Sequence, residues 1–331
     1  MKSFRTEIGA IAGMPEFDYT SRILLAGSCF SDEIGARLKR RLFDVTVNPF
    51  GPLFNPISMA MAIDDIINNR MTCETDFFRL NDRWVTFSRH SRISAGSATE
   101  ASALNNGIIR KLHESLPSVS RYIFTFGSAI AWRHNPADII VANCHKQPGN
   151  LFSRIDLNID EITDRWTDTI QRLLEVSPDA KIIFTVSPVR HIGYGLTTDR
   201  LSKSRLIESC HRLCKLFPDS VSYFPSYEIL TDELRDYRFY AADMVHPSET
   251  ACDYIYDKFA EASMQPCTSE AASRFEKLTR RLLHRHESAE EAKKCRAEVS
   301  DALSELCLNY NIDSDRLRFA LDSFISDYAA Q

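Results

Sequence analysis

The chain has 331 residues, of which 44% are hydrophobic and 26% charged, and its formal net charge is −5 at pH 7. These values are typical of a globular protein with a sizeable core and argue against intrinsic disorder. The acidic balance argues against nucleic acid as a partner, and no apolar stretch approaches the ~18 residues of a membrane span. Nine cysteines without a CxxC pair predict reduced thiols, so a cytoplasmic protein is expected.

The first strong pattern is a short apolar run that meets a helix. Residues 23–26 predict a buried strand, Gly27 permits a sharp turn, and a helix is expected from about Ser31. Ser28 and Cys29 therefore follow the carboxyl end of a strand and precede a helix, where a thiolate or a developing oxyanion is stabilised. A small serine and a buried, inert cysteine in a structural turn are the alternative interpretation of this stretch.

Strands then alternate with amphipathic helices along the chain, as in a parallel sheet covered on both faces. With the first strand, the pattern predicts five strands in a flavodoxin-like, doubly wound α/β sheet. The further strands are expected at residues 43–47, 121–126, 181–186 and 221–224, and the helices that follow the first one at residues 57–67, 99–116, 160–176, 202–217 and 249–262.

Two segments lie outside this alternation. A hairpin that turns at Asn81 and Asp82 predicts an insertion over about residues 71–98. Pro266 marks the end of the sheet domain, residues 1–266, and the charge-rich residues 267–331 carry apolar side chains at helical spacing. We expect this helical extension to be separable from the sheet domain, and its apolar stripe to cover the pocket or to form a homodimer contact.

Polar residues gather directly after the predicted strands, and in a doubly wound sheet these positions open onto one edge. Within the last group, the DxxH spacing lets a carboxylate fix the tautomer of an imidazole that acts as a base. The residues are Ser28, Cys29, Asn48, Gly51, Gly127, Ser128, Arg190, His191, Asp243 and His246.

This combination resembles the SGNH or GDSL hydrolase superfamily and, within it, the GSCFA family, over about residues 4–259. The last residue of the family's name motif is Ser31 here instead of alanine. The helical extension lies outside the resemblance. The motifs that carry it are GSCFS at Gly27, NPFG at Asn48, NP at Asn55, HS at His90, CHK at Cys144, SPVRH at Ser187, YFPSYEI at Tyr223, LRDYRFY at Leu234 and DMVHPS at Asp243.

The resemblance implies an acyl-enzyme mechanism. Aligned with the superfamily's GDSLS pattern, Cys29 takes the place of the nucleophilic serine; Ser28 is the alternative nucleophile and requires a one-residue shift. His246 is then the general base and Asp243 orients it. The helix N-terminus and a protonated His246 are expected to favour a Cys29 thiolate.

The oxyanion donors depart from the superfamily pattern. Gly51 matches the glycine of the second block, but Gly127 and Ser128 stand where the third block continues to a donor asparagine. The Ser128 hydroxyl, the N–H after Gly127, or Asn143 could replace that donor. The remaining motif residues expected to line the pocket, with buried structural roles as the alternative, are His90, His145, Arg190 and His191.

Hydrolysis of an ester in a small molecule or carbohydrate is the first functional expectation. An O- or N-acyltransferase is the second, because a thiol nucleophile and Arg190 also suit a phosphorylated acyl-thioester donor such as coenzyme A. A non-catalytic module that keeps the binding pocket is the third. No metal is expected, since no HExxH or Cys/His ligand spacing occurs, and no other cofactor is implied.

Overall fold

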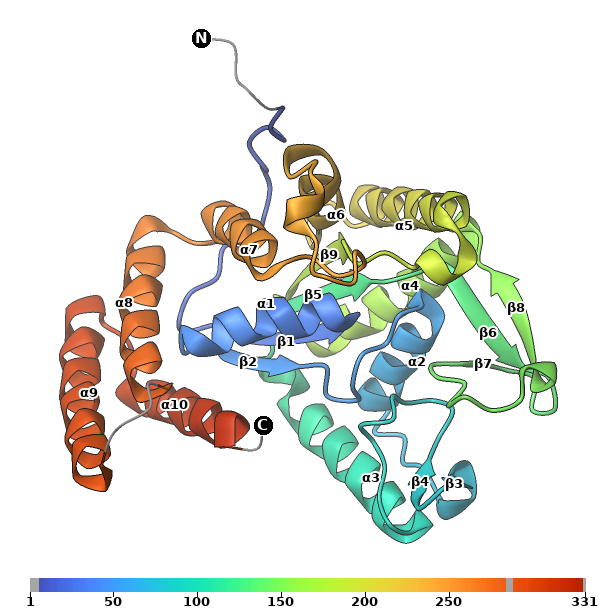
Figure 1. The fold of residues 1–331 in the computed structure, drawn as a ribbon, viewed down its shortest axis with the longest axis horizontal. Helices are drawn as coiled ribbons and strands as arrows, with labels where there is room; N and C mark the ends of the chain where they lie inside the picture. Colours follow the sequence, from blue (N-terminus) through green and yellow to red (C-terminus); the bar gives the residue numbers. More distant parts are fainter. Residues whose placement is uncertain (1–5, 284–287, 330–331) are drawn as a thin grey trace.

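A five-stranded parallel sheet organises the protein, whose computed structural model describes residues 6–283 and 288–329 (Figure 1). Its strand order, β2-β1-β5-β9-β10, is that of a flavodoxin-like sheet, and every neighbouring pair is parallel. The predicted fold class is therefore confirmed. The strands are β1 (Arg22–Gly27), β2 (Asp44–Val47), β5 (Arg121–Phe126), β9 (Lys181–Val186) and β10 (Val221–Phe224).

Helices cover both faces of this sheet because successive side chains of each strand point to opposite faces. Ile23 and Leu25 of β1 pack in one core with α1 (Cys29–Arg40) and α7 (Glu249–Ser263). Leu24 and Ala26 pack in a second core on the other face. The helices of that core are α2 (Pro56–Ile67), α3 (Ala98–Ser115), α4 (Ile159–Val176) and α5 (Leu196–Leu216).

The predicted hairpin exists, formed by β3 (Phe78–Leu80) and β4 (Arg83–Val85). A second antiparallel sheet was not expected from the sequence. It consists of β7 (Ile139–Val141), β6 (Ile130–His134) and β8 (Phe152–Asp156), in that order. The sequence pattern indicated only the apolar run around β7, because β6 and β8 are five-residue strands that mix polar and apolar side chains without regular alternation.

Two segments differ from the predicted elements. α5 begins at Leu196, earlier than the expected residue 202, directly after Gly195, which has φ +86°. Before α7, the chain forms the short helix α6 (Ser226–Glu228), then a π-helical turn at Ile229–Glu233 and a 3-10 turn at Tyr237–Phe239.

No helix in the described ranges combines the length and apolarity needed to cross a membrane.

The extension comprises α8 (Pro266–Leu283), α9 (Ala289–Tyr310) and α10 (Ser314–Ala329), drawn in orange and red beside α1 and β2 in Figure 1. It shares a core with the sheet domain, because Tyr19 stacks on Phe43 at 4.5 Å between ring centroids and meets the edge of Phe275 at 5.2 Å. The Thr279 hydroxyl also donates to the Arg40 carbonyl at 2.6 Å. The domain boundary near residue 266 and the separability of the extension stay predictions.

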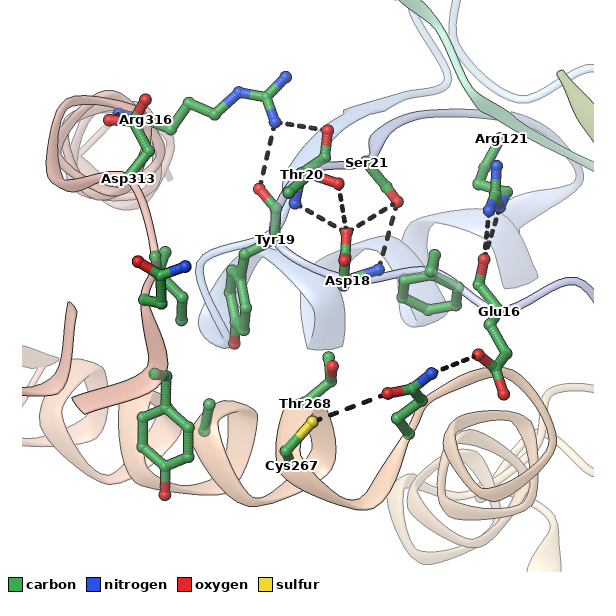
Figure 2. A pocket seen from close by; sticks show the side chains of 16 residues that line it. Glu16, Asp18, Tyr19, Thr20, Ser21, Arg121, Cys267, Thr268, Asp313 and Arg316 are labelled. Atoms are coloured by element: carbon green, nitrogen blue, oxygen red, sulfur yellow. Dashed lines mark hydrogen bonds between the residues drawn. The ribbon is translucent and has the colours of Figure 1, made fainter. Parts of the chain in front are cut away.

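A cavity of about 600 Å³ lies between residues 16–21 and the extension (Figure 2). The Arg316 guanidinium of α10 donates to the carbonyls of Tyr19 and Thr20. On its far side, the Arg121 guanidinium donates to the Glu16 carbonyl at 2.9 Å. Because Arg121 is the first residue of β5, this cavity lies at the amino ends of the strands, away from the edge where the predicted site residues gather.

Candidate active site

Ser28 and Cys29 occupy very different environments at the turn between β1 and α1. Ser28 is the N-cap of α1: it is fully buried and its hydroxyl accepts from the N–H of Phe30 at 3.3 Å. Cys29, the first residue of the helix, is partly exposed. The helix therefore begins two residues earlier than expected, and the Ser31 hydroxyl instead donates to the Thr125 hydroxyl at 2.8 Å. Of the two candidate nucleophiles, the cysteine is the accessible one.

Gly27 and Asn48 hold this turn in place. A Cβ at Gly27, where φ is +153°, would collide with the backbone of Thr125, so only glycine fits there. The N–H of Gly27 donates to Asn48 Oδ1 at 2.8 Å, and Asn48 Nδ2 donates to the Ser28 carbonyl at 3.3 Å and to Asp32 Oδ1 at 2.7 Å. The side chain of Asn48, which follows β2, thereby fixes the backbone around Cys29.

Asp243 and His246 form the predicted pair. Asp243 Oδ2 and His246 Nδ1 are 2.6 Å apart, and Asp243 Oδ1 accepts the N–H groups of Val245 at 2.9 Å and His246 at 3.0 Å. The hydrogen bond from the His246 side chain is the main reason why the pKa of Asp243 falls to about 2. The loop is attached to the end of β9, because the N–H of Arg190 donates to the Val245 carbonyl at 3.1 Å.

Lys203 is a site residue that sequence reasoning missed. Its side chain is 1% exposed, and its Nζ donates to the carbonyls of Gly127 and Ser187 at 2.7 Å each, just past the ends of β5 and β9. Burial lowers its pKa to about 8, against the opposing effects of Asp199 and Cys29. The spacing of Lys203 to Leu206 and Cys210 on α5 is the signal that could have placed it on the buried face.

The surroundings of the Cys29 thiol disfavour the thiolate on balance. Its pKa is raised, first by burial and then by the carboxylates of Asp32 and Glu33, while its own backbone N–H and the Lys203 ammonium act in the opposite direction. Burial and the two carboxylates thus act against the helix N-terminus, and the expected preference for a thiolate stays a prediction.

His191 links these groups. Its ring contacts Phe54 edge-on, with 5.8 Å between centroids, and its backbone N–H donates to Asp199 Oδ1 at 3.1 Å. Its pKa is lowered to about 4, mainly by burial and further by the neighbouring charges of Lys203 and His246. Its Nε2 is buried and has no hydrogen-bond partner in the part of the chain that the structure describes. His191 is therefore a neutral imidazole with one nitrogen unused, in the same neighbourhood as Lys203 and His246.

Three of the predicted oxyanion donors are engaged within the protein. The N–H of Gly51 donates to the Asn48 carbonyl at 2.7 Å, and those of Gly127 and Ser128 donate to the Phe54 carbonyl at 2.9 and 3.0 Å. The Ser128 hydroxyl accepts from the N–H of Ile130 at 3.0 Å. These groups therefore already have partners within the protein, and the assignment of an oxyanion donor stays a prediction.

Two further motif histidines, His145 and His90, differ in burial. His145 is buried, with its Nε2 2.8 Å from the Thr86 carbonyl, and burial lowers its pKa. Its backbone N–H donates to Asn143 Oδ1 at 2.8 Å. His90 is partly exposed and packs so closely on Gly51 that a Cβ there would collide with its side chain. The geometry of His145 matches the buried structural role that sequence analysis left open.

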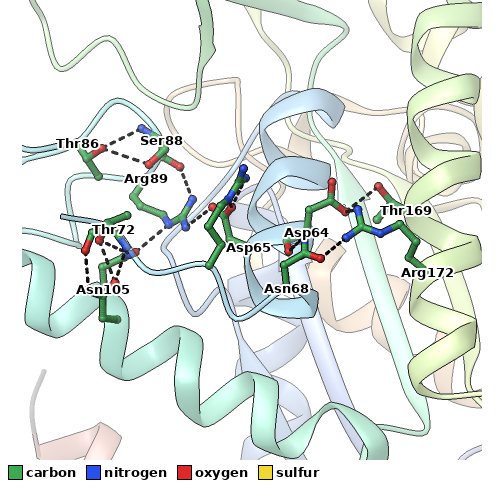
Figure 3. A network of polar contacts seen from close by, with 12 residues as sticks. Asp64, Asp65, Asn68, Thr72, Thr86, Ser88, Arg89, Asn105, Thr169 and Arg172 are labelled. Carbon is green, nitrogen blue, oxygen red and sulfur yellow. Dashed lines mark hydrogen bonds and ion pairs between the residues drawn. The ribbon is translucent and has the colours of Figure 1, made fainter.

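A buried arginine holds the loop that carries His90 (Figure 3). Arg89 is fully buried; its guanidinium pairs with Asp65 of α2 at 2.7 Å and donates to Asn105 Oδ1 of α3 at 2.9 Å. The same guanidinium lies 4.1 Å from the centroid of the Phe50 ring. Arg89 thus ties the HS motif to two helices, a role that the sequence did not reveal.

Within residues 6–283 and 288–329, no group of three or more His, Cys, Asp and Glu side chains is arranged to hold a metal ion.

The sequence model of the GSCFA family matches residues 22–259. The comparison with curated proteins finds no match. Among solved structures, an acetyl xylan esterase (Est2A) from the rumen bacterium Butyrivibrio proteoclasticus is similar over 73% of this chain and 63% of its own, with 10% identity and a TM-score of 0.37. The chain thus spans less than two thirds of that esterase.

Proposed function

The chain belongs to the GSCFA family, and from this premise we propose that it is an acyl-transfer enzyme that hydrolyses an ester through an acyl-enzyme on Cys29. The observation that carries the proposal is the 2.6 Å contact between Asp243 and His246 at the sheet edge onto which the partly exposed Cys29 also opens. Ser28 is a weaker candidate because its hydroxyl is buried and occupied as a helix cap.

In the proposed reaction, Nε2 of His246 takes the proton of the Cys29 thiol as the sulfur attacks the ester carbonyl carbon. The tetrahedral intermediate collapses, the bond to the leaving oxygen breaks, and His246 returns the proton to that oxygen. A water molecule, deprotonated by His246, then attacks the thioester and releases the acid and the thiol. Asp243 accepts from Nδ1 throughout, which keeps Nε2 available as the base.

Negative charge on the intermediate requires stabilisation. The N–H of Cys29 is the first of α1, where helix N–H groups lack partners in the helix, and it is the donor we assign. The buried Lys203 ammonium, which already lowers the pKa of the Cys29 thiol, adds a fixed positive charge. A single well-placed donor lowers such a barrier by roughly 3 kcal/mol.

An acyltransferase is the second candidate, favoured by Arg190, whose guanidinium donates to the Met244 carbonyl in the dyad loop. In that case an alcohol or amine, rather than water, attacks the thioester on Cys29. A binding module without catalysis would form no thioester at all.

The test is intact mass after incubation with neutral aryl esters and with acyl thioesters. We expect one acyl adduct on the wild type and on Ser28→Ala, none on Cys29→Ala, and a turnover lowered by roughly 10³-fold or more in Cys29→Ala. Cys73→Ala, at an exposed cysteine of the insertion, is the matched control and should behave as wild type. An adduct that persists in Cys29→Ala but disappears in Ser28→Ala would reassign the nucleophile, and no adduct with any donor would contradict covalent catalysis.

A further inference from the structure

A pocket of about 470 Å³, here called the arginine pocket, opens beside Arg190. Its walls are the start of α5, the π-helical turn and the 3-10 turn at Tyr237–Phe239. The residues that line it are Arg190, Arg200, Leu230, Thr231, Asp232, Leu234, Arg235, Asp236, Tyr237 and Tyr240.

The arginine pocket shares a loop with His246. Arg190, which lines the pocket, donates from Nη1 to the Met244 carbonyl at 3.4 Å and from its backbone N–H to the Val245 carbonyl at 3.1 Å. Both acceptors lie between Asp243 and His246. The pocket is therefore joined to the dyad loop through Arg190.

The guanidiniums of this pocket are held by neutral groups. Arg190 lies 3.8 Å from the centroid of the Tyr240 ring, and Arg200 donates to the Tyr227 hydroxyl at 2.6 Å. Arg235 is exposed and has no hydrogen-bond or ion-pair partner among the described residues. Their positive charges are thus not neutralised by direct pairing with carboxylates.

Two carboxylates also line the pocket, and one of them is already paired. Asp236 accepts from the backbone N–H of Arg238 at 2.9 Å and from its guanidinium at 3.0 Å, and these bonds lower its pKa. Asp232 accepts from the Thr231 hydroxyl at 3.3 Å. Three guanidiniums against two carboxylates, one of which Arg238 compensates, leave the pocket positive.

We propose that the arginine pocket binds a phosphate group carried by the substrate of the acyl-transfer reaction. Phosphate matches the two-pronged donor geometry of arginine, and it has more acceptor oxygens than a carboxylate with which to bind several arginines at once. The volume is in the range of small-molecule sites and exceeds the need of a lone anion, so the phosphate belongs to a larger molecule. The inference rests on the proposed function only in assigning that molecule as the acyl donor or acceptor.

Binding is tested by calorimetric titration of the full chain with pyrophosphate, inorganic phosphate and, as the carboxylate comparison, acetate. We expect saturable binding of pyrophosphate, weaker binding of phosphate and none of acetate. Arg235→Gln, an exposed position at which folding is not at risk, and Arg190→Gln should each raise the dissociation constant about tenfold. Arg110→Gln removes an exposed arginine of α3 outside the pocket and should leave it unchanged. Absence of saturable pyrophosphate binding, or an equal loss in Arg110→Gln, would overturn the proposal.

Two further arms separate this inference from the proposed function and identify the source of the phosphate. Pyrophosphate should bind Cys29→Ala as it binds the wild type, because Cys29 does not line the pocket. If the wild type binds pyrophosphate but forms no acyl adduct with any donor, the pocket stands and the acyl-enzyme is refuted. Acetyl phosphopantetheine and acetyl pantetheine differ by one phosphate. A roughly tenfold higher kcat/KM for the first, lost in Arg235→Gln, places the phosphate on the donor; equal values with retained pyrophosphate binding place it on the acceptor.

Discussion

Cys29 is partly exposed, and the pKa of its thiol is raised. Burial and the carboxylates of Asp32 and Glu33 raise its pKa, although it begins a helix and lies near the Lys203 ammonium. A raised thiol pKa means that a base must remove the proton at the moment of attack. In the proposed mechanism, the Asp243–His246 pair is that base.

The first prediction concerns alkylation of this thiol. Because the thiolate is the reactive form, Cys29 should react with iodoacetamide slowly at acidic and neutral pH and faster only above the usual thiol range. Mass mapping of carboxamidomethylation from pH 5 to pH 10 measures this, with the exposed Cys73 as the internal reference. Rapid, selective labelling of Cys29 at pH 5 would instead indicate a preformed ion pair with an imidazolium.

The second prediction concerns His191 and acid stability. Its pKa is about 4 in the folded protein against 6.5 for an ordinary histidine, so between these values the unfolded chain binds the proton more readily. The contribution of His191 to the free energy of unfolding is therefore fully present above pH 6.5. It is lost as the pH falls towards 4, by at most ~3 kcal/mol. His191→Gln should remove that part of the acid dependence in urea unfolding.

His211→Gln is the control for His191, because His211 lies exposed on α5 and its imidazole has no comparable burial to lose. An unchanged acid slope in His191→Gln would show that the His191 ring is hydrated in solution.

At the scale of elements, the loop of residues 86–92 depends on helices that are distant in the chain. Arg89 joins it to α2 through Asp65 and to α3 through Asn105 (Figure 3). On the other side of α2, Asp64 pairs with Arg172 of α4 at 3.1 Å. The insertion and the helical layer are therefore connected by one polar network, which positions His90 against Gly51.

The third prediction tests this connection. Arg89→Leu leaves the buried Asp65 without its buried partner, so the free energy of unfolding should fall by about 3–5 kcal/mol. Arg70→Gln removes the other guanidinium on Asp65, which is 62% exposed, and should cost less than about 1 kcal/mol. Urea unfolding of both variants provides the comparison. Equal losses of unfolding free energy in the two variants would mean that the buried Arg89–Asp65 pair stabilises the fold no more than the exposed Arg70–Asp65 pair does.

At the scale of the whole molecule, the extension and the candidate site lie at opposite edges of the sheet. The extension packs near the start of β1 and β2, through Tyr19 and Phe43, while Cys29 and the dyad lie beyond the strand ends. This placement indicates a role for the extension in stability. Its use in a homodimer stays a prediction, for which Leu308 and Phe319, 83% and 62% exposed, are the side chains to examine.

The fourth prediction separates these roles. Phe275→Ala opens a cavity in the shared core and should lower the free energy of unfolding by about 3–5 kcal/mol, whereas Phe319→Ala should change it by less than about 0.5 kcal/mol. A chain ending at Gln265 exposes Tyr19 and Phe43 and should melt earlier or aggregate. If it remains soluble, monomeric and as stable as the full chain, the extension is a separable unit. Size-exclusion chromatography and thermal melts measure both.

Local sequence patterns by themselves predict most of the regular elements of this protein. The five strands, the order of helices around them and the hairpin at Asn81 follow from periodicity and turn residues, because such patterns depend on neighbours within one element. Local patterns also predicted that Ser28 and Cys29 follow β1 and that Asp243 and His246 are close enough to pair.

Only the tertiary structure decided which groups are accessible and which are occupied. The fold buries Ser28 as the cap of α1 and leaves Cys29 partly exposed. It also brings the carbonyls of Gly127 and Ser187 to Lys203. Three arginines from separate segments line one pocket. The small sheet of β6, β7 and β8 likewise forms through pairings between segments whose own patterns are weak. Hydrogen-bond partners and burial depend on residues far apart in the chain, and no local pattern encodes them.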